Sequence, residues 1–152
     1  MKRIISIILA LVVVFSFAGC GTAKQSDAKE ASNSSNVPFE ESDAYYQTKK
    51  LLNNNLAQIY PKYDYNKGES VFTISCTAPD GTAEALVSSP DSMRSGWTEF
   101  TDSIKELSSA TYQYFVASGY DVDCIIIILN DKNPDKVLYS VYNGVCISDI
   151  LQ

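Results

Sequence analysis

An apolar stripe in the second half of the chain constrains the fold more than any other feature. Ser89-Pro90-Asp91 supplies a helix N-cap, a proline at the first helical position and a carboxylate at the positive end of the helix dipole. The residues that follow repeat at alternating steps of four and three, which is the spacing of one helix face. The members of the stripe are Met93, Trp97, Phe100, Ile104, Leu107, Thr111 and Tyr114. We therefore expect one helix over 90–118, capped by Gly119, that buries a single face against a core.

Three strands are expected after this helix. Residues 121–129 are apolar on both faces, which is typical of a central strand. The polar stretch 130–135 turns the chain back into a second strand over 136–142. Asn143-Gly144 is a strong signal for a two-residue hairpin turn, and it leads into a third strand over 145–150.

The first half of the domain is expected to hold a helix and one strand. Ser42-Asp43 indicates a helix start, and Pro61 ends an apolar face that runs to Tyr60. A loop with Tyr60, Tyr63 and Tyr65 follows, and residues 69–77 have the branched and aromatic content of a strand. After the turn at 79–81, residues 82–88 fit either a short helix or an irregular segment.

The element order α-β-α-β-β-β predicts an α+β domain of two layers. We expect both helices on one face of a mainly antiparallel sheet of three to four strands. The first strand would be joined to the second through the long helix by a right-handed crossover. This pattern, with a helix bearing Trp97, the stretch Asn130 to Lys136 and a terminal Asn-Gly hairpin, looks like small lipoproteins of anaerobic Gram-positive bacteria. That resemblance carries no activity with it.

The N-terminus has the three parts of an export signal. Met1-Lys2-Arg3 is basic, the run from Ile4 to Ala18 is apolar except for Ser6 and Ser16, and small residues precede Cys20. The apolar run is shorter than the roughly 20 residues that cross a bilayer. Ala18-Gly19-Cys20 resembles the lipobox of bacterial lipoproteins, although the family prefers an aliphatic residue where Phe17 stands. The resemblance implies that Cys20 is thioether-linked to a diacylglycerol and becomes the mature N-terminus.

Two other interpretations of this segment remain open. An ordinary signal peptidase would cut nearby, for example after Ala23, or the segment would stay as an uncleaved anchor. With the lipobox, residues 1–19 are a signal peptide that is removed, and 20–39 are the lipidated cysteine and a polar, disordered tether. Residues 40–152 then form one globular domain, held on the outer side of the cytoplasmic membrane by its lipid and not by a spanning helix.

Charge and residue types exclude several classes of partner and mechanism. The chain has 12 basic and 18 acidic residues, and loss of Lys2 and Arg3 with the signal peptide would make it still more negative. Nucleic acid is therefore not expected as a partner, because binding it needs basic side chains. Histidine is absent from the whole sequence, which excludes a histidine general base and imidazole metal ligands.

Three cysteines remain once Cys20 is lipidated. Cys76, Cys124 and Cys146 each lie in a strand-like run, where a buried thiol behaves as a small hydrophobe, so we favour three free thiols over one disulfide. If Leu129 pairs with Val137, Val141 lies opposite Ile125 as well as Cys146. Cys124 and Cys146 would then face opposite sides of the sheet, although a one-residue slip would reverse this.

Two groups of polar residues contain side chains that could bind a metal ion or transfer protons. Asp131-Lys132-Asn133-Pro134-Asp135 opens like a calcium loop, but Lys136 and Tyr142 stand where that loop needs Gly and Glu. We interpret it as turn chemistry. Asp121 and Asp123 lie on one strand face and are interpreted as solvated strand ends rather than an acid-base pair. The sequence therefore predicts no catalytic residue, no metal site and no cofactor.

Two surfaces are predicted to bind a partner. Exposed tyrosines give broad contact area for sugars or proteins, and Tyr60, Tyr63 and Tyr65 cluster in the loop after the first helix. If both helices cover one sheet face, an apolar patch remains on the other face and would mark a protein interface or a homodimer. The residues expected there are Ile126, Ile128, Tyr142 and Ile147.

These observations favour a membrane-anchored, non-enzymatic binding or interaction module outside the cytoplasm. Alternatives from other classes are a small enzyme that uses Asp121 and Asp123 or a free thiol, and an inhibitor or immunity-like protein. A solute-binding protein with two lobes is not expected, because residues 40–152 are too few to form two lobes that close on a ligand.

Overall fold

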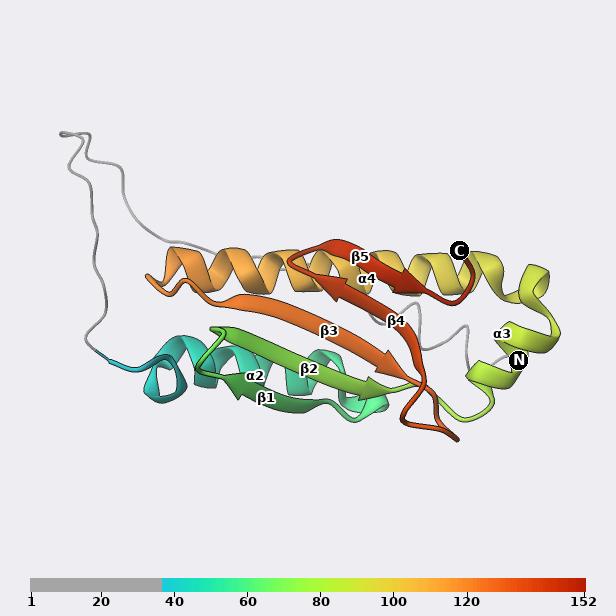
Figure 1. Cartoon of the computed structure of the whole chain (residues 1–152), viewed down its shortest axis with the longest axis horizontal. Coiled ribbons are helices and arrows are strands. Elements are labelled where there is room, and N and C mark those ends of the chain that lie inside the picture. The colour runs from blue at the N-terminus through green and yellow to red at the C-terminus, as the bar shows by residue number, and fades with distance from the viewer. Residues whose placement is uncertain (1–36) are drawn as a thin grey trace.

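The computed structural model describes residues 37–152, in which two long helices lie on one face of a five-stranded sheet (Figure 1). The helices are α2 (Asp43–Asn55), α3 (Thr82–Ser88) and α4 (Pro90–Ala117), with short 3₁₀ turns at Phe39–Glu41 and Ala57–Ile59. The strands are β1 (Lys62–Asn66), β2 (Val71–Thr77), β3 (Asp123–Leu129), β4 (Val137–Tyr142) and β5 (Val145–Asp149). The predicted α+β class is confirmed.

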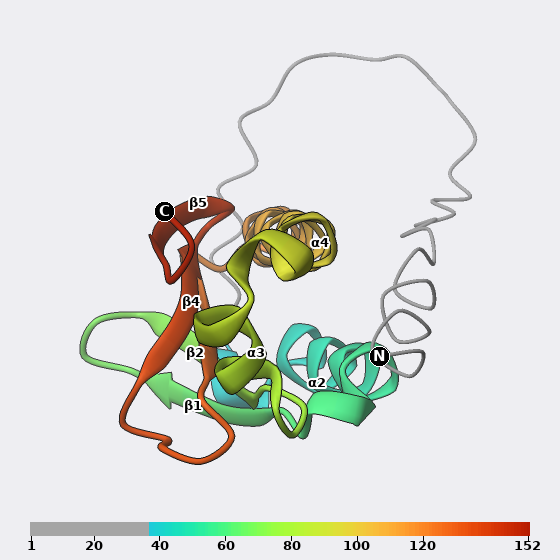
Figure 2. The same cartoon turned by 90° about the vertical axis from the view of Figure 1, so that its right-hand side faces the viewer.

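The strands lie side by side in their order along the chain, from β1 to β5. All neighbouring pairs are antiparallel except β2 and β3, which are parallel because the chain crosses from one to the other through α3 and α4. Figure 2 shows the sheet nearly edge-on, with α2 and α4 on the same side of it. The prediction of a mainly antiparallel sheet was thus correct, but the predicted sheet lacked one strand. Residues 82–88, for which a helix and an irregular segment were both possible, form the helix α3.

The strand missing from the prediction is β1, which occupies the stretch that we expected to be a tyrosine-rich loop. Its side chains alternate between exposed and half-buried, as in a strand with one covered face. Tyr63 pairs with Ile74 and Tyr65 with Phe72 across the antiparallel ladder. The alternation of tyrosine with polar residues is thus the period of a strand and not the composition of a loop.

The two long helices begin as the sequence predicts. The hydroxyl of Ser42 accepts a hydrogen bond from the backbone N–H of Tyr45 at 3.2 Å, which caps α2. Ser89 precedes α4 at the expected N-cap position, but its side chain makes no capping hydrogen bond. Gly119 follows the end of α4 with φ of 86°, the left-handed conformation that suits glycine.

The core lies between the helices and one face of the sheet. Phe39 of the first 3₁₀ turn belongs to this core. The centroid of its ring lies 4.8 Å from that of Phe115 in α4 and 4.8 Å from that of Tyr65 in β1. Phe72 of β2 is fully buried and lies 5.5 Å from Phe115. Edge-to-face contacts of this kind add to the free energy of burying the rings. This aromatic cluster connects the first 3₁₀ turn, α4, β1 and β2.

Two β-bulges set the register of the last three strands. Leu129 pairs with Val137 as expected, but a bulge then shifts the ladder, so that Val141 lies opposite Ile126 and not Ile125. In the β4–β5 pair Val141 lies opposite Cys146 as expected, and a second bulge beyond this pair places Ser140 opposite Ser148. The expected pairing of Val141 with Ile125 is therefore wrong, because an extra residue in one strand reverses which face the residues beyond it occupy.

Candidate binding surfaces

One face of the sheet is not covered by any helix of the described residues, and we call it the open sheet face (Figure 2). Its side chains belong to the half-buried positions that alternate with fully buried ones along β2 and β3. The central part of the open sheet face comprises Thr73, Ser75, Thr77, Ile125, Ile127, Leu129, Ser140 and Tyr142. The aliphatic residues come from the central strand β3 and the hydroxyl-bearing residues from the strands beside it. Lys62 and Asp64 of the edge strand β1 pair with Ser75 and Thr73, so the surface has an apolar centre, a polar surround and charged side chains at its edge.

Tyr142 lies at one end of this face beside Asp123. Its hydroxyl donates a hydrogen bond to the carboxylate of Asp123, and this bond raises the pKa of Tyr142. Asp123 also accepts a hydrogen bond from the side-chain amide of Asn143 at 2.6 Å. Both oxygens of the Asp123 carboxylate are thus used to hold the start of β3 against the β4–β5 turn.

The prediction of which isoleucines face outward was wrong for two residues. Ile126 and Ile128 have no exposed surface and pack against the helices, whereas Ile125 and Ile127 face outward. Ile147 is 65% exposed, but it lies in the bulge of the edge strand β5. Because β3 is apolar at every position from Cys124 to Leu129, alternation within this stretch does not distinguish its two faces.

The three predicted tyrosines do not form one exposed cluster. Tyr60 is 75% exposed, but Tyr63 and Tyr65 of β1 are half-buried on the helix side of the sheet. The Tyr63 ring stacks 5.9 Å from that of Phe72, and its hydroxyl donates to Oδ1 of Asn53 at 2.9 Å. Burial raises the pKa of Tyr63. Tyr63 and Tyr65 are therefore packing residues in this fold.

The polar stretch between β3 and β4 uses its own side chains in turns. Oδ1 of Asn130 accepts from the backbone N–H groups of Lys132 and Asn133, at 2.8 and 3.0 Å. Asp131 accepts from the backbone N–H of Gly81 at 2.9 Å, which fastens this loop to the start of α3. These bonds support the interpretation as turn chemistry. Within residues 37–152, no three acidic or cysteine side chains are placed to bind a metal ion together.

The three cysteines within residues 37–152, namely Cys76, Cys124 and Cys146, are free thiols. Cys76 and Cys124 are fully buried, and burial raises the pKa of each thiol to about 12. Cys146 is half-buried and lies on the same sheet face as Cys124, contrary to prediction, because the bulge in the β3–β4 pair shifts Val141, the partner of Cys146, to a position opposite Ile126. Strand β4 lies between the strands that carry Cys124 and Cys146.

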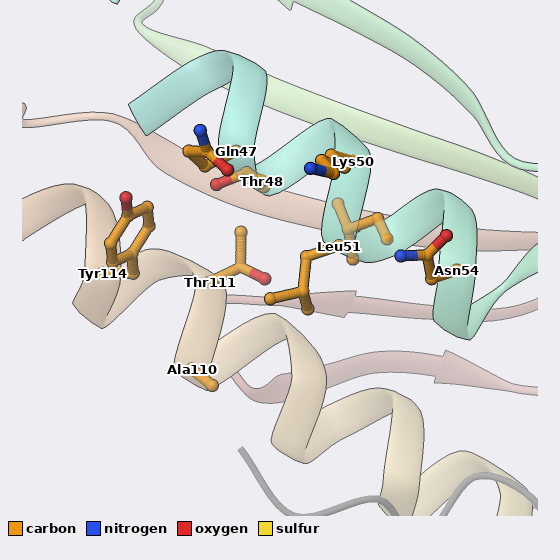
Figure 3. A pocket seen from close by; sticks show the side chains of 9 residues that line it. Gln47, Thr48, Lys50, Leu51, Asn54, Ala110, Thr111 and Tyr114 are labelled. Carbon is orange, nitrogen blue, oxygen red and sulfur yellow. The ribbon is translucent and has the colours of Figure 1, made fainter. Parts of the chain in front are cut away.

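A groove of about 420 Å³ lies on the other side of the molecule, between α2 and α4 (Figure 3). Its walls are lined by Gln47, Thr48, Lys50, Leu51, Leu52 and Asn54 of α2, and by Ala110, Thr111 and Tyr114 of α4. Figure 3 shows Leu51 of α2 directed toward α4, and Thr111 and Tyr114 directed back toward α2. Its size is within the range of small-molecule sites, about 300–1,000 Å³.

The sequence contains no local signal for this groove. The stripe of α4 predicted that Thr111 and Tyr114 face the rest of the protein, but not that α2 lies beside them. The contributing residues of the two helices are separated along the chain by about half of the described residues. A groove between such distant segments exists only once the sheet has placed both helices on one face.

Among the described residues, no helix has both the length and the hydropathy needed to cross a membrane. Comparison with protein-family models, with curated proteins and with solved structures found no match to this chain.

Proposed function

We propose that the protein is a lipid-anchored, non-enzymatic interaction module that binds another protein through the open sheet face. The anchor is Cys20, which follows the apolar run from Ile4 to Ala18 and lies outside the described residues. Two acyl chains on such a cysteine suffice for stable attachment, since each buried methylene contributes about 0.8 kcal/mol. The module would stand on the outer side of the cytoplasmic membrane.

The composition of the open sheet face is the observation that carries this proposal. Ile125, Ile127 and Leu129 form its centre, and Thr73 and Ser140 lie on either side. Protein interfaces have an apolar, charge-poor centre and a polar rim, which this arrangement matches. A nucleic acid or an anionic headgroup layer would need basic side chains, and none lies at the centre of this face.

An enzymatic function has less support than protein binding. Both oxygens of Asp123 accept hydrogen bonds from Tyr142 and Asn143, whereas Asp121 is exposed and lies outside β3. The thiols of Cys76 and Cys124 are fully buried and have pKa values of about 12, which keeps them protonated and inaccessible at neutral pH. These groups hold the fold together, and an inhibitor or immunity-like role would be a special case of protein binding.

Site-specific photo-crosslinking on living cells tests the surface. A photoreactive residue at Ile127 should give a defined protein adduct, because Ile127 is at the centre of the proposed interface. The matched control is Val116, which is 50% exposed on α4, outside the open sheet face. An adduct specific to Ile127 supports the proposal, and an adduct between two copies identifies a homodimer. No adduct at Ile127, or the same adducts at both positions, would contradict it.

A separate measurement tests the anchor. Mass spectrometry of the protein from its native membrane should show a diacylglycerol-modified Cys20 at the N-terminus. Cys20→Ser should abolish the modification, whereas Cys146→Ser should retain it. An unmodified Cys20 in the wild type, or a mature N-terminus at another residue, would overturn the lipid anchor but leave the surface proposal standing.

A further inference from the structure

The groove between α2 and α4 contains a threonine hydroxyl that makes no hydrogen bond with the described part of the chain. Thr48 is 6% exposed and lines the groove, and no hydrogen bond within residues 37–152 involves its side chain. Thr111, opposite it, is 5% exposed. The buried side-chain oxygens without a hydrogen-bond partner among the described residues belong to Thr82 and Asp131, so the Thr48 hydroxyl is open to the groove. It can therefore hydrogen-bond to a ligand that occupies the groove.

The charge of the lining is the second observation. Although the chain has 18 acidic residues, none lies among the nine described residues that line the groove. Lys50 is the one charged residue among these nine, and its side chain makes no ion pair within the described residues. The groove is therefore locally positive in an acidic protein, which favours an anion over a cation.

The apolar part of the lining defines the rest of the ligand. Leu51 and Leu52 of α2 and Ala110 of α4 contribute aliphatic surface, and Leu52 is almost fully buried. Sites of this size bind ligands by burying an apolar body and orienting it with a few polar groups. Gln47 and Asn54 add amide groups to the lining.

We propose that this groove binds a small organic monoanion with an apolar body, such as a monocarboxylate. The carboxylate interacts with Lys50 and accepts a hydrogen bond from the Thr48 hydroxyl, while the apolar body lies on Leu51 and Ala110. The site is on the helix layer and shares no residue with the open sheet face. It is therefore independent of the proposed protein interface.

A matched set of three probes tests the charge preference. Phenylacetate, phenylethanol and phenethylamine share an aromatic body and differ in carrying a carboxylate, a neutral hydroxyl or an ammonium group. We would titrate each into the full, methyl-labelled chain in lipid nanodiscs and follow the methyl signals of Thr48, Ala110 and Thr111. Phenylacetate should shift these signals saturably and bind about three- to fivefold more tightly than phenylethanol, while phenethylamine should bind most weakly.

Three variants test the residues. Lys50→Glu should weaken phenylacetate binding about three- to tenfold and remove the preference over phenylethanol. Thr48→Val retains the shape but removes the hydroxyl, and should weaken binding of phenylacetate. Ala110→Leu fills the groove and should abolish binding of all three probes. Lys136→Glu is the matched control, because it makes the same charge change on an exposed residue outside the groove and should leave binding unchanged.

The outcomes separate the proposal from its alternatives. If no probe shifts the groove methyl signals saturably, water alone satisfies Thr48 and the proposal fails. If the three probes bind equally, or if Lys50→Glu and Lys136→Glu have the same effect, the site does not select an anion. Should Ala110→Leu unfold the protein, the Lys50→Glu and Thr48→Val titrations still decide the result. None of these outcomes depends on crosslinking at Ile127.

Discussion

Asn143 joins the last hairpin to the start of β3 through Asp123. Its side-chain amide donates to Oδ1 of Asp123 at 2.6 Å, and its own Oδ1 accepts from the backbone N–H of Cys124 at 2.7 Å. Its backbone N–H also donates to the carbonyl oxygen of Cys124 at 2.9 Å. One turn residue thus satisfies a carboxylate and two backbone groups of the central strand.

Asn143→Ala is expected to lower the free energy of unfolding by about 2–4 kcal/mol. The variant loses the bond to a charged group and places alanine in the left-handed conformation, since φ of Asn143 is 48°. Urea unfolding measures the effect. The control is Asn133→Ala in the exposed loop, where Oδ1 accepts one long bond of 3.3 Å from the Asp135 N–H. Equal losses in both variants would show that the bond to Asp123 contributes little.

Gly144→Ala is expected to destabilise the protein by about 1–3 kcal/mol. Gly144 has φ of 85°, and a Cβ there would lie 2.7 Å from Cβ of Ser109 on α4. Thermal unfolding should show a lower Tm, and adding Ser109→Gly should restore part of the loss by removing the clash. Gly68→Ala, whose new Cβ meets its nearest neighbour at 3.5 Å, should have little effect. Failure of Ser109→Gly to restore any stability would argue against the close approach of turn and helix.

Asp149→Ala is expected to cost about 1–3 kcal/mol by leaving a buried indole N–H without an acceptor. Trp97 is 4% exposed, and its Nε1–H donates to Oδ1 of Asp149 at 2.7 Å. Trp97 is the one tryptophan of the chain, so its fluorescence reports unfolding directly. Asp149→Asn retains an acceptor and should lose less. If Asn and Ala were equally destabilising, the carboxylate charge and not the hydrogen bond would be responsible.

Stability should fall as the pH rises above about 9. Burial raises the pKa of Cys76 and Cys124 from 9.0 to about 12, so the unfolded thiols ionise first. The stabilisation is complete below the unfolded pKa and is lost as the pH rises from about 9 toward 12, by up to about 1.4 kcal/mol per pH unit for each thiol. Urea unfolding between pH 8 and about pH 10.5 measures the slope.

Removing the two thiols provides the control for this pH dependence. Cys76→Ala combined with Cys124→Ala should flatten the slope but not abolish it, because burial also raises the pKa of Tyr63 and Tyr139. A double variant as steep as the wild type would show that the tyrosines alone cause the loss.

Elements with a strong local pattern were predicted well from the sequence. The alternating stripe of α4 needs one helix face and one core, and Trp97, Ile104 and Leu107 are buried as expected. Asn143-Gly144 adopts positive φ at both positions, which few other residue pairs do readily. In these segments local conformational preference and burial favour the same structure.

Features that depend on contacts between segments far apart in the sequence were not predicted. Tyr63 and Tyr65 look like exposed loop tyrosines until Phe72 and Phe39 lie against them. The groove likewise requires Thr48 and Thr111, which lie on different helices, to face each other. No window of sequence contains both partners, so no local pattern reports the contact.

The sequence by itself determined the α+β class, the long helix and the last hairpin turn, because periodicity and turn chemistry act over a few neighbouring residues. The tertiary structure decided which isoleucines face outward. Strand β3 is apolar at every position from Cys124 to Leu129, so its sequence does not show which of its two faces is buried. The side on which the helices pack buried Ile126 and left Ile127 on the open sheet face, and the bulge in the β3–β4 pair decided which residues of β4 share each face.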